Sequence, residues 1–284
     1  MENNKALRVF AEEVRLETLR ELAHLGFGHV GGAMSIVEVL AVLYGGELRH
    51  DPARPRMEER DKLVISKGHA GPALYAALAL RGFFPKETLL TLNQGGTTLP
   101  SHCDRNKTPG VDMTCGSLGQ GLSAACGIAL GDRSLGRDSY TYVILGDGEC
   151  NEGQVWEAAA FAPHNKLDRL IAFVDLNKQQ LDGACDDVLY MGDMTDKWAA
   201  FGWHTQKVDG HSVDAVLDAV RRAKETHGKP SMIILDTVKG HGCELAENTF
   251  PCHHIAFTAE AIAPSLARAE QMLADARKAL GEGR

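Results

Sequence analysis

Residues 140–154 read Tyr-Thr-Tyr-Val-Ile-Leu-Gly-Asp-Gly-Glu-Cys-Asn-Glu-Gly-Gln. The first six residues are rich in β-branched and aromatic side chains and stop at a glycine, which predicts a buried parallel strand. Beyond the strand, Gly146 and Gly148 allow the backbone to approach a bulky anion, and Asp147 offers a hard oxygen to a divalent cation. A Gly-Asp-Gly tripeptide alone would equally fit a strand-to-loop turn with a solvated aspartate.

A second strand end follows thirty residues further along the chain. The apolar run Leu-Ile-Ala-Phe-Val at 170–174 is followed by Asp175, Leu176 and Asn177. Asn177 adds a neutral oxygen to the carboxylate of Asp147. Two such ligands at adjacent strand ends, completed by waters or phosphate oxygens, are typical of a Mg²⁺ site.

Composition sets the class of protein. The chain has 284 residues, 44% of them hydrophobic, and a formal net charge of −8. Helical patterns alternate with short apolar runs, which predicts an α/β fold with a mostly parallel sheet and helices on both faces. The acidic balance argues against a nucleic-acid partner. No apolar run is long enough to cross a bilayer, so no membrane partner is expected. The first residues do not read as a signal peptide.

Cysteine usage predicts a reducing, cytoplasmic environment. The seven cysteines are an odd number and include no Cys-x-x-Cys pair. A metal cluster at Cys252, His253 and His254 is disfavoured, because no other cysteine lies at chelate spacing.

Periodicity and capping signals divide the chain into elements. One helix is expected at 5–25, and a capping box from Ser35 to Glu38 opens a second helix that runs to Tyr44. Residues 93–116 form a long loop, whose length indicates function. Further helices are expected at 72–81, from 116 to about 134, at 153–164 and 193–201, after Ser212 and from about 258, with strands near 61–66, 140–145, 170–174, 203–208 and 231–238.

Gly-Asp-Gly-Glu-x-Asn-Glu-Gly-Gln-x-Trp-Glu-Ala, followed by Asn177, resembles the thiamine diphosphate signature of the transketolase family. The resemblance implies a thiamine diphosphate-binding fold of the diphosphate (PP) type, as a single N-terminal domain over residues 1–284. It also implies a Mg²⁺ ion, or Ca²⁺ or Mn²⁺ in its place, bound by Asp147, Asn177 and the carbonyl group of Gln179. The diphosphate loop would comprise Gly146, Asp147, Gly148 and Glu149.

Further motifs extend the resemblance along the chain. They are Gly-His-Val-Gly-Gly-Ala-Met-Ser at 28–35, Ser-Lys-Gly-His at 66–69, Thr-Pro-Gly-Val-Asp at 108–112 and Gly-Ser-Leu-Gly-Gln-Gly at 116–121. The implied active-site histidines are His29, His69, His102 and His253, with His254 not excluded in place of His253. His69 faces substrate or cofactor, Glu152 reaches toward the partner subunit's site, and the thiamine contacts are Gly116, Ser117, Leu118 and Leu181.

Two residues depart from the family pattern. Ser101 stands where glycine is usual and Cys103 where proline is usual, and both flank His102. Loss of the proline frees the backbone after the histidine, so the placement of His102 is the least secure implication. The change also suggests an altered substrate.

The family's enzymes complete their site with a second, pyrimidine-binding domain, and no second βαβ series occurs in these 284 residues. We therefore expect the N-terminal subunit of a split transketolase. It would act with a C-terminal partner as a heterotetramer and transfer a two-carbon ketol unit from a ketose, expected to be phosphorylated, to an aldose. Donor and acceptor remain open.

Two alternatives are weighed against this prediction. The first is another thiamine enzyme subunit, similar to deoxyxylulose-phosphate synthase or to a dehydrogenase E1 chain; the Ser-Lys-Gly-His and Thr-Pro-Gly-Val-Asp strings argue against both. The second is a non-catalytic subunit that only binds a partner. The intact pair of Asp147 and Asn177 argues against that.

Overall fold

A five-stranded parallel sheet forms the centre of the computed structural model, which describes residues 2–281. The spatial order is β2-β3-β4-β6-β5, and every neighbouring pair is parallel. All five predicted strands are present, with ends shifted by one or two residues. Their bounds are β2 Lys62–Ile65, β3 Thr141–Gly146, β4 Leu170–Leu176, β5 His204–Asp209 and β6 Ser231–Asp236.

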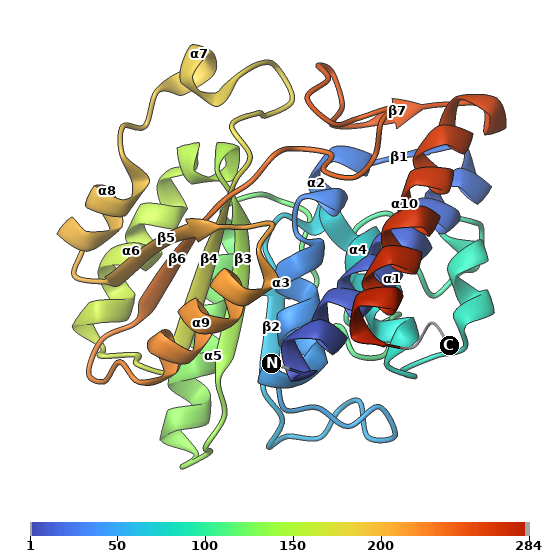
Figure 1. Cartoon of the computed structure of the whole chain (residues 1–284). Coiled ribbons are helices and arrows are strands. Elements are labelled where there is room, and N and C mark those ends of the chain that lie inside the picture. The colour runs from blue at the N-terminus through green and yellow to red at the C-terminus, as the bar shows by residue number, and fades with distance from the viewer. Residues whose placement is uncertain (1, 282–284) are drawn as a thin grey trace.

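Helices cover both faces of the sheet, as the sequence predicted (Figure 1). Alternate strand residues feed two separate cores: Val143 and Leu145 face one, whereas Tyr142 and Ile144 face the other. The first core contains α5 (Gln120–Ser134), α6 (Gly153–His164) and α8 (Met194–Ala200). The second contains α1 (Glu2–Leu25), α3 (Val37–Val42), α4 (Gly71–Leu80), α9 (Val213–Lys224) and α10 (Ala259–Leu280).

A small antiparallel pair joins two distant parts of the chain. Strand β1 (Phe27–Gly28) pairs with β7 (Ile255–Ala256), so that Phe27 lies opposite Ala256. The residue after β1 is His29, and the residues before β7 are His253 and His254. This pairing, which the sequence did not reveal, therefore fixes the histidines of the two segments next to each other.

The predicted capping box at Ser35 is wrong. Instead of one helix, this region contains α2 (Val30–Met34), α3 and a short π-helix at Leu43–Glu47. Helix α3 starts after Ile36, so Ser35 is not its N-cap. Instead of capping, the Ser35 hydroxyl donates to Asp175 Oδ2 (2.7 Å), and Glu38 pairs with Arg15. A buried carboxylate is a stronger acceptor, and it must be satisfied.

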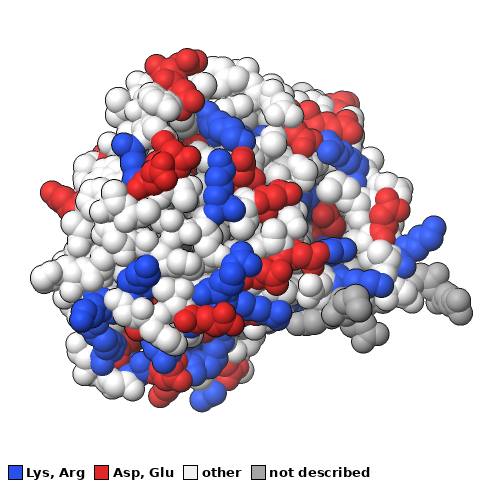
Figure 2. Space-filling view, turned by 60° about the vertical axis from the view of Figure 1, so that its left-hand side comes forward, with Lys and Arg blue, Asp and Glu red and all other residues white. Residues whose placement is uncertain are grey.

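No helix within residues 2–281 is long and apolar enough to cross a membrane. On the face drawn in Figure 2, basic and acidic side chains are interspersed, and no continuous basic surface is visible.

The entry to α5 requires a glycine at one position. Gly119 is the N-cap of α5 with φ +86°, and a Cβ there would lie 2.7 Å from Cβ of Glu152. We predict that Gly119→Ala lowers the free energy of unfolding by about 1–3 kcal/mol, measured by urea titration. Gly127→Ala is the control, because Gly127 lies within the same helix with open space around it. Equal stability of the two variants would contradict the prediction.

Candidate active site

The loops that leave the carboxyl ends of β3 and β4 meet at one edge of the sheet, below α7 (Cys185–Leu189) at the top of Figure 1. Asp147, which follows β3, is only 3% exposed. Its carboxylate accepts hydrogen bonds from the backbone N–H groups of Gly148 (2.8 Å) and Lys178. Burial, and then the nearby charge of Asp175, raise the pKa of Asp147 to about 6.

The other two predicted metal ligands lie beside Lys178. Asn177 Oδ1 accepts from the backbone N–H of Gln179 (3.1 Å), and Asn177 Nδ2 donates to Asp175 Oδ2 (2.7 Å). The Gln179 carbonyl accepts from Lys239 Nζ (2.9 Å). Three oxygen donors, one of them a buried carboxylate without a cationic side-chain partner among the described residues, fit a hard divalent cation. A bound dication would also stabilise the ionised carboxylate of Asp147 and so lower its pKa.

Asp175 connects the surrounding elements. It is fully buried at the end of β4 and forms an ion pair with Lys67 Nζ, which also donates to the Gly32 carbonyl (2.7 Å). Burial alone would raise the pKa of Asp175. The Lys67 ammonium, with hydrogen bonds from Thr237 and Ser35, outweighs it and lowers the pKa. This network joins the ends of β2, β4 and β6 to α2 and holds the Asn177 amide in one orientation.

The four histidines predicted from separate motifs lie together. The ring centroid of His29 is 5.5 Å from that of His69, 5.3 Å from that of His102 and 5.4 Å from that of His253. His69 and His253 are 4.7 Å apart. His254 also contacts His29 (4.7 Å), so both members of the pair left open by the sequence belong to the cluster.

The environment keeps these rings neutral at physiological pH. Burial, followed by the neighbouring histidines, lowers the pKa of His29 to about 3. Burial, followed by Lys239 and Lys67, lowers the pKa of His253 to about 4. Burial also lowers the pKa values of His69 and His102. A neutral imidazole has one lone pair, so His29, His69 and His102 can each accept a proton or a hydrogen bond.

The loop around His102 is anchored although the usual proline is missing. Tyr75 Oη donates to the Pro100 carbonyl (2.8 Å), and the backbone N–H of Cys115 donates to the Cys103 carbonyl (3.1 Å). Cys103 itself is buried. These contacts anchor the backbone on both sides of His102 in the absence of the proline.

Glu149 is the last residue of the loop predicted to bind the diphosphate, and its side chain is buried. Its carboxylate accepts from the Ser66 hydroxyl and from the backbone N–H groups of Gly119 (2.9 Å) and Gly146 (3.0 Å). These bonds fix the loop against the start of α5. Both oxygens of the Glu149 carboxylate therefore have protein partners, and the bond from Gly146 holds the start of the loop in place.

An open cleft of about 620 Å³ lies in front of His102. Gly116 and Ser117 line it and are exposed, as is the neighbouring Leu118. Leu181, on the loop after β4, is 59% exposed. The residues expected to contact thiamine are thus accessible at the carboxyl end of the sheet, where open α/β sheets bind their ligands.

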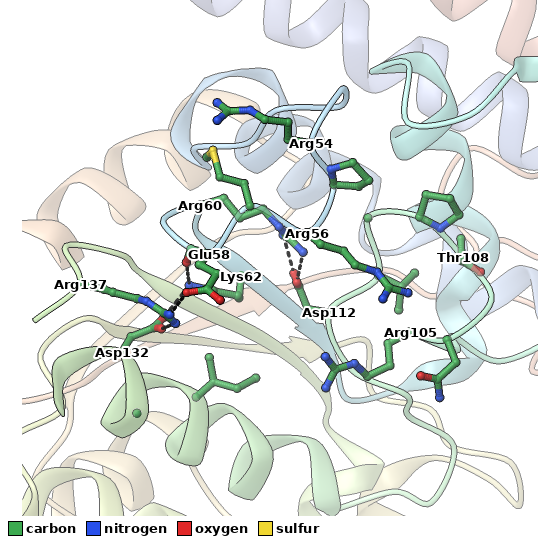
Figure 3. A pocket seen from close by; sticks show the side chains of 18 of the residues that line it. Arg54, Arg56, Glu58, Arg60, Lys62, Arg105, Thr108, Asp112, Asp132 and Arg137 are labelled. Carbon is green, nitrogen blue, oxygen red and sulfur yellow. Dashed lines mark hydrogen bonds and ion pairs between the residues drawn. The ribbon is translucent and has the colours of Figure 1, made fainter. Parts of the chain in front are cut away.

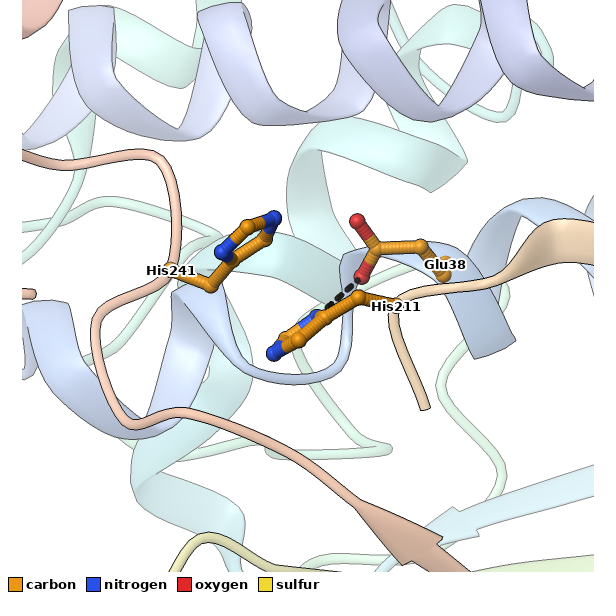
Figure 4. A group of neighbouring side chains, drawn as sticks. All are labelled: Glu38, His211 and His241. Carbon is orange, nitrogen blue, oxygen red and sulfur yellow. Dashed lines mark hydrogen bonds and ion pairs between the residues drawn. The ribbon is translucent and has the colours of Figure 1, made fainter. Parts of the chain in front are cut away.

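Glu38, His211 and His241 form a second group of metal-ligating side chains (Figure 4). The backbone N–H of Val238 donates to His211 Nε2 (2.8 Å), so the proton of this neutral ring is on Nδ1 and faces Glu38 Oε2 (3.3 Å). The buried Arg15 pairs with the other oxygen of Glu38. His211 Nε2 and one oxygen of Glu38 already accept hydrogen bonds, and the positive charge of Arg15 would repel a cation. We therefore assign this group a structural role.

The sequence interpretation missed several residues of the site. Asp175 and Lys67 were inside quoted motifs but were given no role, and Lys239 and Thr237 were passed over. A carboxylate at the buried end of a parallel strand is the same signal that singled out Asp147, and it could have indicated Asp175. No feature of the sequence around Lys67, which follows β2, could have shown that its side chain reaches Asp175.

Comparison with known proteins agrees with this geometry. Residues 7–271 match the family model described as "Transketolase, thiamine diphosphate binding domain". The chain is 52% identical over 261 residues to the 6-deoxy-6-sulfo-D-fructose transketolase subunit SqwG of Clostridium sp. (strain MSTE9), covering 92% of this chain and 95% of that protein. It is 37% identical over 233 residues to an apulose-4-phosphate transketolase subunit of Phocaeicola vulgatus, covering 82% and 83%.

Solved structures give the same result. Transketolase from Leishmania mexicana superposes with a TM-score of 0.86 at 28% identity, and the alignment covers 97% of this chain and 46% of that one. Pichia stipitis transketolase in complex with sedoheptulose-7-phosphate gives 0.84 at 29%, covering 99% and 45%. The chain spans just under half of the length of these transketolases. From the matched motifs, the shared fold and these relatives, we conclude that the chain belongs to the transketolase family.

Proposed function

We propose that the chain is the thiamine diphosphate-binding subunit of a split transketolase. The observation that carries this proposal is the juxtaposition of two groups at one sheet edge. The oxygen donors of Asp147, Asn177 and Gln179 lie there, and Lys239 links them to the neutral histidine cluster, because its Nζ donates both to the Gln179 carbonyl and to His253 Nδ1 (3.4 Å). A metal-bound diphosphate and a reacting carbon need these two environments side by side.

The donor set indicates how the cofactor would be held. Asp147, Asn177 and the Gln179 carbonyl would bind Mg²⁺, and Gly146 and Gly148 would let the backbone approach the diphosphate. When bound, thiamine diphosphate supplies a carbanion and an electron sink for the two-carbon fragment. Leu118 and Leu181 would pack against the thiamine rings.

The chain's own catalytic contribution is proton transfer and orientation. His29, His69 and His102 carry free imidazole lone pairs, so they can accept hydrogen bonds and protons from substrate hydroxyl groups. Lys239 donates to Nδ1 of His253, so the proton of this neutral ring lies on Nε2, which can donate a hydrogen bond to a substrate oxygen. Burial and the positive charges of Lys239 and Lys67 oppose protonation of His253 and keep its ring neutral.

The substrate we propose is a ketose with a terminal anion, and 6-deoxy-6-sulfo-D-fructose is the first candidate donor. The name of the relative that is 52% identical specifies this sugar, and the name of a relative at 37% specifies apulose-4-phosphate. In the reaction the C2–C3 bond of the ketose breaks. The two-carbon ketol unit passes to an aldose acceptor, and the rest of the donor leaves as an aldose that retains the terminal anion.

We further propose that a C-terminal, pyrimidine-binding subunit completes the site, in a cytoplasmic heterotetramer of two chains of each kind. Exposed apolar side chains support such a contact: Leu118 before α5, and Leu181 and Tyr190 on the segment after β4, the last of which is 69% exposed. The exposed face of α5 carries small residues, including Gly127, that permit close approach of another helix. Glu152 stands beside Gly119 at the start of this face.

Asp147→Asn tests the metal assignment without relying on activity. Since the native pKa of Asp147 is raised above its ordinary value, its ionised form destabilises the unliganded protein at neutral pH. The variant should therefore melt at the same temperature or higher, yet lose Mg²⁺-dependent binding of thiamine diphosphate when mixed with the partner.

In the unmodified protein, binding of Mg²⁺ and thiamine diphosphate should weaken as the pH falls through about 6, because the metal requires the ionised carboxylate of Asp147. Asp186→Asn, which changes an exposed carboxylate in α7, is the control. Unchanged Mg²⁺-dependent binding in Asp147→Asn would contradict the assignment.

Asp175→Asn tests the supporting network. The substitution leaves the buried Lys67 ammonium without its counter-charge, so we expect a loss of about 3–5 kcal/mol in the free energy of unfolding. Adding Lys67→Met should restore part of that loss in the double variant, measured by urea titration. An additive effect of the two substitutions would show that the pair is not coupled.

The proposed activity has a direct assay. The chain and its C-terminal partner are mixed with Mg²⁺ and thiamine diphosphate, and ketol transfer from 6-deoxy-6-sulfo-D-fructose is followed beside phosphorylated ketoses. We expect turnover only in the mixture, with the sulfonated sugar preferred. Turnover by the chain alone would refute the split-subunit proposal. Cofactor binding without transfer from any ketose would favour a non-catalytic subunit.

A further inference from the structure

A second cleft, of about 800 Å³, lies at the opposite edge of the sheet from Asp147 (Figure 3). One wall is the segment 54–60 that precedes β2, the other wall is the loop 105–112, and the last turns of α5 close the side. Lys62, the first residue of β2, lies in the floor, whereas Asp147 follows the last residue of β3. The two clefts are therefore separate sites.

The charge of this cleft contrasts with that of the chain. Its lining contains seven basic residues and three acidic ones, an excess of four positive charges (7 − 3), in a protein with a formal net charge of −8. The basic residues are Arg54, Arg56, Arg60, Lys62, Arg105, Lys107 and Arg137, and the acidic ones are Glu58, Asp112 and Asp132. Such a concentration in a concave surface attracts anions.

The ion pairs of the cleft build its floor and leave other cations free. Asp112 binds the Arg60 guanidinium through both oxygens and accepts the backbone N–H of Leu63 (2.8 Å). Asp132 pairs with Lys62 (2.7 Å) and Arg137 (3.1 Å). The remaining acidic residue, Glu58, also pairs with Arg137.

Three basic residues of the lining have no carboxylate within 4.0 Å among the described residues: Arg56, Arg105 and Lys107. Arg56 belongs to one wall, and Arg105 and Lys107 belong to the other. Figure 3 shows Arg56 and Arg105 entering the cleft from these two segments. Their charges are thus available to a ligand that reaches both walls.

The backbone that carries Arg105 and Lys107 is held in place. The N–H of Arg105 donates to Thr114 Oγ1 (3.1 Å), which in turn donates to Asp104 Oδ1 (3.1 Å). Thr108 Oγ1 donates to the Thr98 carbonyl. A wall fixed at these points presents its cations at a stable spacing, which lowers the entropy cost of binding.

We propose that this cleft binds a small molecule with two phosphate groups, one at Arg56 and the other at Arg105 and Lys107. Guanidinium groups bind phosphate oxygens through paired hydrogen bonds, and a single negative charge would leave one wall unpaired. The cleft volume suits a ligand of sugar-bisphosphate size. The inference does not depend on the proposed ketol transfer.

The experiment is isothermal titration of the full-length chain with fructose 1,6-bisphosphate and, separately, with inorganic phosphate, in the absence of thiamine diphosphate. We expect one site per chain that is weakened by added salt, with the bisphosphate bound at least about tenfold more tightly than inorganic phosphate. The double variant Arg56→Ala/Arg105→Ala should weaken bisphosphate binding at least about tenfold, since it removes charge-assisted hydrogen bonds on both walls. Arg222→Ala/Lys229→Ala removes the same charge from an exposed surface on and beyond α9 and should change binding less than about twofold.

Several results would overturn the proposal. They are no measurable binding of the bisphosphate, equal affinity for inorganic phosphate, and the same loss in both double variants, which would indicate a general effect of net charge. If Arg56→Ala/Arg105→Ala leaves bisphosphate binding unchanged but weakens association with the partner subunit, the cleft is a protein contact and the ligand proposal is wrong.

Discussion

The buried ion pair between Lys67 and Asp175 is the interaction on which the arrangement of the site depends. Moving two charges out of water is costly, and the cost is repaid only when further hydrogen bonds satisfy both groups. Ser35, Thr237 and Asn177 supply those bonds to Asp175, and the Gly32 carbonyl accepts from Lys67. Gly32 lies in α2 and Ser35 is its C-cap, Thr237 follows β6 and Lys67 follows β2, so satisfying one pair of charges fixes the positions of these elements relative to β4.

This network determines the electrostatics of two neighbouring sites in opposite ways. On the histidine side, burial and then neighbouring ammonium groups, Lys67 among them, lower the pKa values of His69 and His253. On the metal side, the Asp175 carboxylate contributes to the raised pKa of Asp147. A cation is therefore unfavourable among the histidines and favourable beside Asp147. The same buried ion pair thus contributes to the lowered pKa values of the histidines and to the raised pKa of Asp147.

The strands and most helices could be predicted because each depends on local signals: apolar runs, glycine stops and helical spacing. The four histidines could be proposed for one site because each lies in its own motif, but only His69 follows a strand of the parallel sheet, and the antiparallel pairing of β1 with β7 brings His29 and His253 together. Ser35 shows where local reasoning fails. Its capping-box pattern is genuine, yet a buried carboxylate 140 residues away takes its hydroxyl. Lys67, Lys239 and the pairing of β1 with β7 were likewise invisible, because their partners are distant in sequence.

The substitution of Cys103 for proline illustrates the same limit. From the sequence, loss of proline implied a looser loop around His102. In the fold, Tyr75 and Cys115 hold the backbone on both sides of that histidine. These tertiary hydrogen bonds could not have been predicted from residues 99–104 alone, because their partners lie outside that segment.

The central claim is that this chain provides the metal and diphosphate half of a thiamine diphosphate site, with four histidines facing the reacting carbon. The most direct measurement is a crystal structure of the chain with its C-terminal partner, thiamine diphosphate and Mg²⁺. The account predicts density for the metal on Asp147, Asn177 and the Gln179 carbonyl, with the thiazolium C2 atom facing His29, His69, His102 and His253. Cofactor bound elsewhere, or a metal held without Asp147, would contradict it.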